Sequence, residues 1–322
     1  MANLASLVKV APETVASLRA KLESGAPLPE KYRVLFSLRN IEGQEAHEAL
    51  ALALRDPSAL FRHDVAFCLG QRQDPAAIGV LQALLRDSGE HPMVRHEAGE
   101  ALGAIGAPDC LAALRAHAAD AAPEVAETCQ LALERIEYFA SHGGGGAGEG
   151  GSPYLSVDPT PPLPADTPVD ALRRILLDPK QPMFERYRAL FALRNRGGDA
   201  AVAVLCEAFS AASALLKHEV AYVLGQLQHP RSVPALSSVL RDPREHAMVR
   251  HEAAEALGAV ADPACVALLK AHAADAEPIV AHSCVVALDM LEHEASGAFE
   301  YCAAAQDGGG GAQAAAAAVE AR

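Results

Sequence analysis

Four pairs of a histidine followed directly by a carboxylate recur at regular spacing in the sequence. They are His63-Asp64, His96-Glu97, His218-Glu219 and His251-Glu252. The spacing within each half of the chain is 33 residues (63 to 96 and 218 to 251), and the offset between the halves is 155 residues (63 to 218). Histidine nitrogens and carboxylate oxygens bind iron and zinc in proteins. The pattern therefore predicts one set of metal ligands in each half of the chain.

Repetition, rather than any single pair, supports this prediction. A lone His-Glu pair on a helix is ordinarily a polar pair with no ligand. A duplication explains why the two halves agree, but it does not explain why successive repeats agree within one half, where FRHDVAFCLGQ and VRHEAGEALGA differ around the shared pair. Two further pairs, His47-Glu48 and His293-Glu294, have no counterpart at the 155-residue offset, and we expect solvated surface residues there.

Two histidines and one carboxylate in each half form the ligand set of a 2-His-1-carboxylate iron site, which leaves positions open for oxygen and substrate. Zinc hydrolases use the same donor types, so the donors alone do not select the metal. Two such sets in a pseudo-twofold array predict a dinuclear centre. Glu100 and Glu255 lie one helical turn after the second histidine of each half, and we expect them to support the structure or the ligands.

Two other histidine pairs obey the same offset, His91 with His246 and His117 with His272. All four lie near the predicted ends of helices, where a side chain can satisfy terminal backbone groups. We therefore expect capping roles for them.

Helical patterns of 12 to 16 residues must position the paired residues. Asp-Pro and similar dipeptides separate these patterns, because Asp caps a helix and Pro is tolerated in its first turn. About eight helices precede residue 140 and about eight follow residue 166. They predict an all-α fold, an α-solenoid of about eight HEAT-type helical hairpins in two pseudo-symmetric halves. Stacking of equivalent helices would place His63 beside His96 and His218 beside His251.

The duplication and the composition set the expected domain boundaries. We predict an N-terminal repeat half over 1–140 and a C-terminal repeat half over 169–302. Residues 141–168 are rich in Gly, Ser and Pro and predict a flexible linker. The low-complexity tail, 303–322, is expected to be disordered.

Composition and charge exclude several classes of protein. Hydrophobic residues make up 51% of the chain but aromatic residues only 4%, which suits closely packed helices of Ala, Leu and Val. The net charge of −14 argues against nucleic acid and favours a cationic partner. Seven cysteines without CxxC spacing indicate a reducing compartment, and no apolar run could span a membrane. We expect a cytoplasmic protein.

The motifs resemble those of a known enzyme family. HPMVRHEAGEALGAIG and LKHEVAYVLGQLQHP are similar to motifs of the deoxyhypusine hydroxylases, and the similarity extends over roughly 28–295. The resemblance implies a monooxygenase with two ferrous ions that uses O2 as co-substrate. Its protein substrate would be a translation initiation factor carrying deoxyhypusine, a butylamine-extended lysine. The reaction would complete hypusine synthesis. We expect the enzyme to act as a monomer.

The resemblance also implies a role for each paired residue. One iron would be held by His63, His96 and Glu97, and the other by His218, His251 and Glu252. The remaining carboxylates, Asp64 and Glu219, would bind the substrate amine and approach the metals. The sequence departs from the family at Asp64, where glutamate is expected.

Two alternatives compete with the hydroxylase. The repeat form VRxEAAxALGxxxDP also resembles the HEAT-like repeat of bilin lyases, so a non-enzymatic scaffold or a bilin-lyase-like binding protein is one alternative. A dinuclear metallohydrolase is the other. Iron content separates these possibilities, because a scaffold needs no metal and a hydrolase would hold zinc or manganese.

Overall fold

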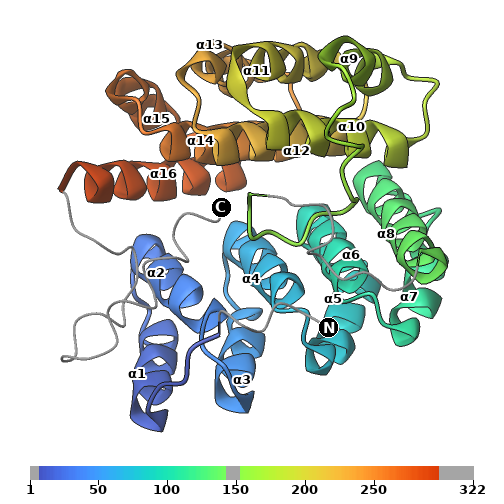
Figure 1. Ribbon diagram of the computed structural model, residues 1–322. Coiled ribbons are helices and arrows are strands. Elements are labelled where there is room, and N and C mark those ends of the chain that lie inside the picture. The colour runs from blue at the N-terminus through green and yellow to red at the C-terminus, as the bar shows by residue number, and fades with distance from the viewer. Residues whose placement is uncertain (1–6, 143–152, 297–322) are drawn as a thin grey trace. The chain divides into compact units, whose positions relative to one another are not determined.

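The computed structural model describes residues 7–142 and 153–296, and these residues form two compact units. The N-terminal unit contains α1–α8 and the C-terminal unit α9–α16, and no β-strand is present within the described ranges (Figure 1). The prediction of an all-α fold, with about eight helices before residue 140 and about eight after residue 166, is confirmed. The described residues form eight α-helices up to residue 141 and eight from residue 169. Positions 1–6, 143–152 and 297–322, with the predicted tail, lie outside the described residues.

The helices of the N-terminal unit are short, as expected for hairpin repeats. They are α1 (Pro12–Glu23), α2 (Leu28–Arg39), α3 (Gln44–Ala53), α4 (Ala59–Gln71), α5 (Ile78–Arg86), α6 (Pro92–Ile105), α7 (Leu111–His117) and α8 (Pro123–Ser141).

The C-terminal unit repeats this pattern. Its helices are α9 (Val169–Leu177), α10 (Met183–Arg196), α11 (Gly198–Glu207), α12 (Ala214–Leu227), α13 (Val233–Arg241), α14 (Ala247–Val260), α15 (Val266–His272) and α16 (Pro278–Ser296).

The even-numbered helices of each unit pack against one another, and the odd-numbered helices pack on them. In the N-terminal unit α4 packs against α6 and α6 against α8, while α5 and α7 lie on α6 and α8. In the C-terminal unit α12, α14 and α16 make the same row, with α13 and α15 on α14 and α16 (Figure 1). This is the stacked-hairpin arrangement of an α-solenoid.

Glycine lets the neighbouring helices of each row approach closely. A Cβ atom at Gly103 of α6 would lie 2.6 Å from the Cβ atom of Ala132 in α8. A Cβ atom at Gly258 of α14 would lie 2.8 Å from the Cβ atom of Ala287 in α16. Neither distance is physically allowed, so the Ala-Leu-Gly motif of the sequence marks points where one backbone rests on the next helix.

Histidine side chains lie at the helix ends that the sequence predicts. His91 and His246 are the N-cap residues of α6 and α14, and each Nδ1 accepts from the backbone N–H two residues later, at 3.2 and 3.3 Å. His117 and His272 end α7 and α15, with Nδ1 2.9 and 3.0 Å from the carbonyl oxygen four residues earlier. The predicted capping roles agree with these contacts.

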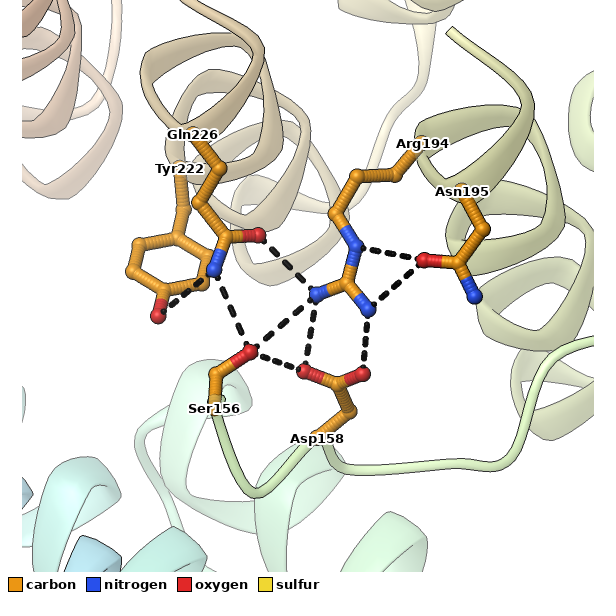
Figure 2. A network of polar contacts seen from close by, with 6 residues as sticks. All are labelled: Ser156, Asp158, Arg194, Asn195, Tyr222 and Gln226. Atoms are coloured by element: carbon orange, nitrogen blue, oxygen red, sulfur yellow. Dashed lines mark hydrogen bonds and ion pairs between the residues drawn. The ribbon is translucent and has the colours of Figure 1, made fainter. Parts of the chain in front are cut away.

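The second part of the predicted flexible linker needs correction, because residues 153–168 pack on the C-terminal unit. Asp158 forms a two-pronged ion pair with the buried Arg194 of α10, with Nη1–Oδ1 and Nη2–Oδ2 distances of 2.8 and 2.5 Å (Figure 2). Ser156 contacts Gln226 of α12, and Thr160 is only 1% exposed. Composition alone does not reveal this packing, since it depends on contacts with residues far along the chain. Among them are the carboxylate that neutralises a buried guanidinium and a hydrogen bond from the Leu163 N–H to the Arg188 carbonyl oxygen.

No helix in the described part of the chain is both long enough and apolar enough to cross a membrane.

Candidate metal centre

The four His-carboxylate pairs lie on the even-numbered helices, one pair on each of α4, α6, α12 and α14. All eight side chains are buried: His63, Asp64, His96, Glu97, His218, Glu219, His251 and Glu252. Burying a carboxylate is costly unless it is paired or binds a cation. The buried acids and imidazoles of each unit therefore indicate a binding site rather than a solvated helix face.

In the N-terminal unit the two histidines lie side by side, as the 33-residue spacing predicts. The ring centres of His63 and His96 are 5.4 Å apart. The Nε2 atom of His63 lies 3.3 Å from Oε2 of Glu97, and its Nδ1 atom lies 2.8 Å from Oδ1 of Asp64. Glu97 thus approaches the nitrogen that faces the cluster, whereas Asp64 approaches the opposite nitrogen of the same ring.

The surroundings of His63 favour a positive charge. Burial by itself lowers the pKa of this imidazole, but hydrogen bonds to Asp64 and Glu97, with the charges of both carboxylates, raise the pKa well above its usual range. The same two carboxylates would attract a metal cation. The N-terminal cluster therefore suits a cation on electrostatic grounds.

In the C-terminal unit the predicted ligand set converges. The rings of His218 and His251 have centres 5.3 Å apart, and Nε2 of His218 lies 3.4 Å from Oε2 of Glu252. One ligand atom from each of these three residues lies within 4.8 Å of the other two. Ligand atoms about 2.1 Å from a shared metal are at most about 4.2 Å apart, so adjustments of about half an ångström would bring them to bonding distance.

A second carboxylate lies near each of the later histidines. In the N-terminal unit ligand atoms of His96, Glu97 and Glu100 lie within 4.8 Å of one another. In the C-terminal unit Oε1 of Glu255 lies 3.7 Å from Nδ1 of His251. The structure thus places Glu100 and Glu255 beside the clusters, in keeping with the supporting role expected from their helical spacing.

The surroundings of Asp64 and Glu219 differ between the two units. Asp64 contacts the ring of its own neighbour, His63, at 2.8 Å. Glu219 is buried on α12 near Tyr222, whose pKa is raised first by burial and further by the charges of Asp158 and Glu219.

Sequence reasoning missed two groups beside the clusters. Ser283 of α16 is fully buried, and its Oγ atom lies 3.4 Å from Nδ1 of His251. Tyr222 of α12 is in the polar network of Figure 2, and burial together with the charges of Asp158 and Glu219 raises the pKa of its phenol. Helical spacing could have found Tyr222, which lies four residues after His218. For Ser283 the signal is its place one repeat, 32 residues, after His251.

One expectation about the remaining histidines is wrong. His47 is only 6% exposed on α3 and is not the surface residue that its lack of a counterpart suggested. The alternation of buried and exposed positions along α3 places its side chain on the packed face. His293, by contrast, is partly exposed near the end of α16.

Comparisons with known proteins agree with the repeat architecture. A family model of HEAT repeats matches residues 47–134 and 202–289, and a model of the PBS lyase HEAT-like repeat matches residues 185–211. The two HEAT matches together cover more than half of the chain and include all four His-carboxylate pairs.

Proteins of known name are similar to this chain over most of its length. The chain is 54% identical over 275 residues to deoxyhypusine hydroxylase from Homo sapiens, a match that covers 85% of this chain and 90% of the relative. It is 53% identical over 282 residues to deoxyhypusine hydroxylase-B from Oryza sativa subsp. japonica, covering 87% and 93%. The structure of human deoxyhypusine hydroxylase in complex with glycerol superposes with a TM-score of 0.84 at 52% identity, covering 87% of this chain and 96% of that one. The chain belongs to the deoxyhypusine hydroxylase family.

Proposed function

We propose that this protein hydroxylates the deoxyhypusine side chain of a translation initiation factor, with O2 as co-substrate and two irons as cofactor. The observation that supports this most directly is the buried cluster of two histidines and a carboxylate, which occurs on equivalent helices of both units. Family membership supplies the substrate class, because the relatives are named for deoxyhypusine.

His63, His96 and Glu97 would hold one iron, and His218, His251 and Glu252 the other. Nitrogen and carboxylate donors of this kind suit ferrous iron and leave coordination positions open. When bound, the irons would supply oxygen activation and the power to oxidise an unactivated C–H bond. The chain supplies the donors in a fixed, buried arrangement, so little side-chain ordering remains to be done on binding.

Asp64 and Glu219 would bind the amine of the substrate. The butylamine extension carries a positive charge at neutral pH, like lysine, and a buried carboxylate stabilises such a charge strongly. Asp64 would also orient His63, because it lies 2.8 Å from Nδ1 of that ring. Direct ligation of iron by Asp64 or Glu219 is the competing assignment for these two residues.

Burial of the clusters would exclude water from the reaction. None of the proposed iron ligands is more than 8% exposed. Low exposure strengthens the attraction between the carboxylates and a cationic substrate, and it protects a reactive site from side reactions. The net charge of −14 would favour approach of a cationic side chain. Both ligand sets are present in one chain, which is the basis for proposing a monomer.

Iron content and product formation test the proposal together. Purified protein reconstituted with ferrous iron should hold about two irons per chain and should add one oxygen atom to the deoxyhypusine-bearing factor, measured by mass spectrometry. His251→Ala should lose about one iron and abolish hydroxylation. The matched control is His246→Ala, which removes a capping imidazole five residues away and should keep both irons. Binding of zinc without oxygen consumption would instead support a hydrolase.

A further inference from the structure

A hydroxyl group and a carboxylate lie together against one edge of the His251 ring. Ser283 Oγ lies 3.4 Å from Nδ1 of His251 and donates to Oε1 of Glu255 at 3.1 Å. Glu255 Oε1 itself lies 3.7 Å from the same Nδ1. Ser283 and His251 are both fully buried, so these contacts form away from solvent.

These contacts favour one tautomer of the imidazole, with its proton on Nδ1. Because the serine O–H donates to Glu255, the Ser283 oxygen is left to accept from an N–H group at Nδ1 of His251. A neutral imidazole with its proton on Nδ1 has its lone pair on Nε2. The Ser283–Glu255 pair therefore selects the form of His251 that can bind a metal through Nε2.

The N-terminal unit holds the same residue types at the equivalent positions. Thr128 of α8 is the counterpart of Ser283 at the 155-residue offset, and it is 2% exposed. Glu100, the counterpart of Glu255, lies with His96 in the N-terminal cluster. A hydroxyl on the following even-numbered helix and a carboxylate one turn after the histidine thus occur in both units.

We propose that Ser283, acting with Glu255, is a positioning residue for the metal ligand His251. It holds the ring so that Nε2 faces the iron. The inference is confined to the C-terminal unit, because Oγ1 of Thr128 makes no hydrogen bond in the described part of the N-terminal unit. This inference rests on the proposed iron centre and deepens it. A hydrogen bond to the second nitrogen orients a ligating histidine and raises its basicity, and loss of such a partner weakens metal affinity about 10- to 100-fold.

The test compares two substitutions that have nearly the same shape. Ser283→Val and Ser283→Thr both add bulk beside α14, but only threonine keeps the hydroxyl group, as Thr128 does naturally. The iron affinity of the full-length protein is measured by competition with a graded series of chelators. We expect one of the two irons to be bound about 10- to 100-fold more weakly in Ser283→Val than in Ser283→Thr, so that a weaker chelator removes it. The optical spectrum of Ser283→Val should also be altered.

Two further variants keep the test decisive. Glu255→Gln retains the side-chain length and removes the charge, so it should weaken the same iron even if Ser283→Val fails to fold. Ser232→Ala removes another fully buried serine hydroxyl of the same unit, whose bond is to the backbone oxygen of His229 at 2.7 Å. It should lower thermal stability without changing iron affinity, which separates positioning from a general loss of stability.

The outcomes for the inference and for the proposed function are distinct. If the unsubstituted protein binds no iron, the proposed function fails. If it binds two irons, and Ser283→Val and Glu255→Gln keep the affinity and spectrum of the unsubstituted protein, then Ser283 does not position His251 and the inference is overturned.

Discussion

At the scale of single residues, the two units share the histidines proposed to bind iron but differ in the first carboxylate of each half, Asp64 against Glu219. An iron ligand must meet a fixed distance and angle, whereas a protonated amine accepts a carboxylate from a range of directions. The contact between Asp64 and His63 at 2.8 Å gives the shorter residue a partner within its own helix. These facts favour amine binding as the common role of both residues.

This division of roles predicts that Glu219→Ala keeps most of its iron but loses hydroxylation of the deoxyhypusine-bearing factor. The lost charge-assisted contact is worth about 1.5–3 kcal/mol. Iron stoichiometry and product formation are measured on the same preparation. Loss of iron in step with activity would make Glu219 a direct ligand.

The companion substitution, Asp64→Glu, should be tolerated, because it restores the residue expected in the family. Its turnover should stay within a few-fold of the unsubstituted protein in the same product assay. A large loss would show that the contact between Asp64 and His63 requires the shorter side chain.

At the scale of helices, an arginine directly before the second histidine of each half anchors the helix that carries the pair. Arg95 Nε donates to the carbonyl oxygen of Leu85 at 3.0 Å, and its two terminal nitrogens bind both carboxylate oxygens of Asp120. Arg250 makes the same contacts to Leu240 and Asp275. The Val-Arg-His-Glu motif thus combines an anchor and a proposed ligand pair in four consecutive residues.

Replacing Asp275 with asparagine should therefore lower the free energy of unfolding by about 1.5–3 kcal/mol at pH 7. Hydrogen bonding to Arg250 lowers the pKa of Asp275 below its usual range, even though burial raises it. The stabilisation is then present above the unfolded-state pKa of about 3.9 and is lost as the pH falls through the lower folded-state pKa. Urea titrations at pH 7 and below pH 4 measure the free energy of unfolding of the unsubstituted protein and of Asp275→Asn. The gap between the two values should close in acid. A constant gap would mean that the ion pair is not its cause.

The close helix contacts predict opposite effects for two glycine substitutions. Gly258→Ala would place a Cβ atom 2.8 Å from Cβ of Ala287, so we expect a loss of about 1–3 kcal/mol in the free energy of unfolding. Gly79→Ala in α5 meets nothing within 4 Å and should stabilise the protein by up to about 1 kcal/mol, because alanine favours the helix. Thermal melts of the two variants measure this. Equal shifts in the melting temperatures of the two variants would contradict the close approach of the helices as the cause.

At the scale of the whole molecule, the boundary of the C-terminal unit lies earlier than its first helix. The segment 153–168 supplies Asp158 to Arg194, whose side chain has no exposed surface. A fragment beginning at residue 153 should therefore be more stable than one beginning at residue 169. The expected difference is about 3–5 kcal/mol, the usual cost of leaving a buried charge without its partner. Urea midpoints of the two fragments measure it, and equal midpoints would contradict this boundary.

The sequence was sufficient to predict the structural features that recur along the chain, but not the features that occur only once. Helix count, hairpin stacking and the adjacency of His63 and His96 follow from period and offset, which are properties of the sequence. The packing of 153–168 rests on contacts between distant parts of the chain, such as the ion pair of Asp158 with Arg194 and the hydrogen bond from the Leu163 N–H to the Arg188 carbonyl oxygen. The burial of His47 depends on which face of α3 is covered. Ser283 was missed because one hydroxyl on a different helix has no local signal, although its pairing with Thr128 at the common offset was available.

The close approach of helices at Gly103 and Gly258 also bears on motion within each unit. Where one backbone rests on a neighbouring helix, there is no intervening layer of side chains that could change rotamer and let the helices slide. Amide hydrogens of α6 and α14 near these contacts should therefore exchange with solvent only when the whole repeat opens, whereas those of the shorter α7 and α15 should exchange by local fraying. The His-carboxylate pairs of α6 and α14 are thus fixed on slowly exchanging helices, and the geometry of each pair is set before any ligand arrives.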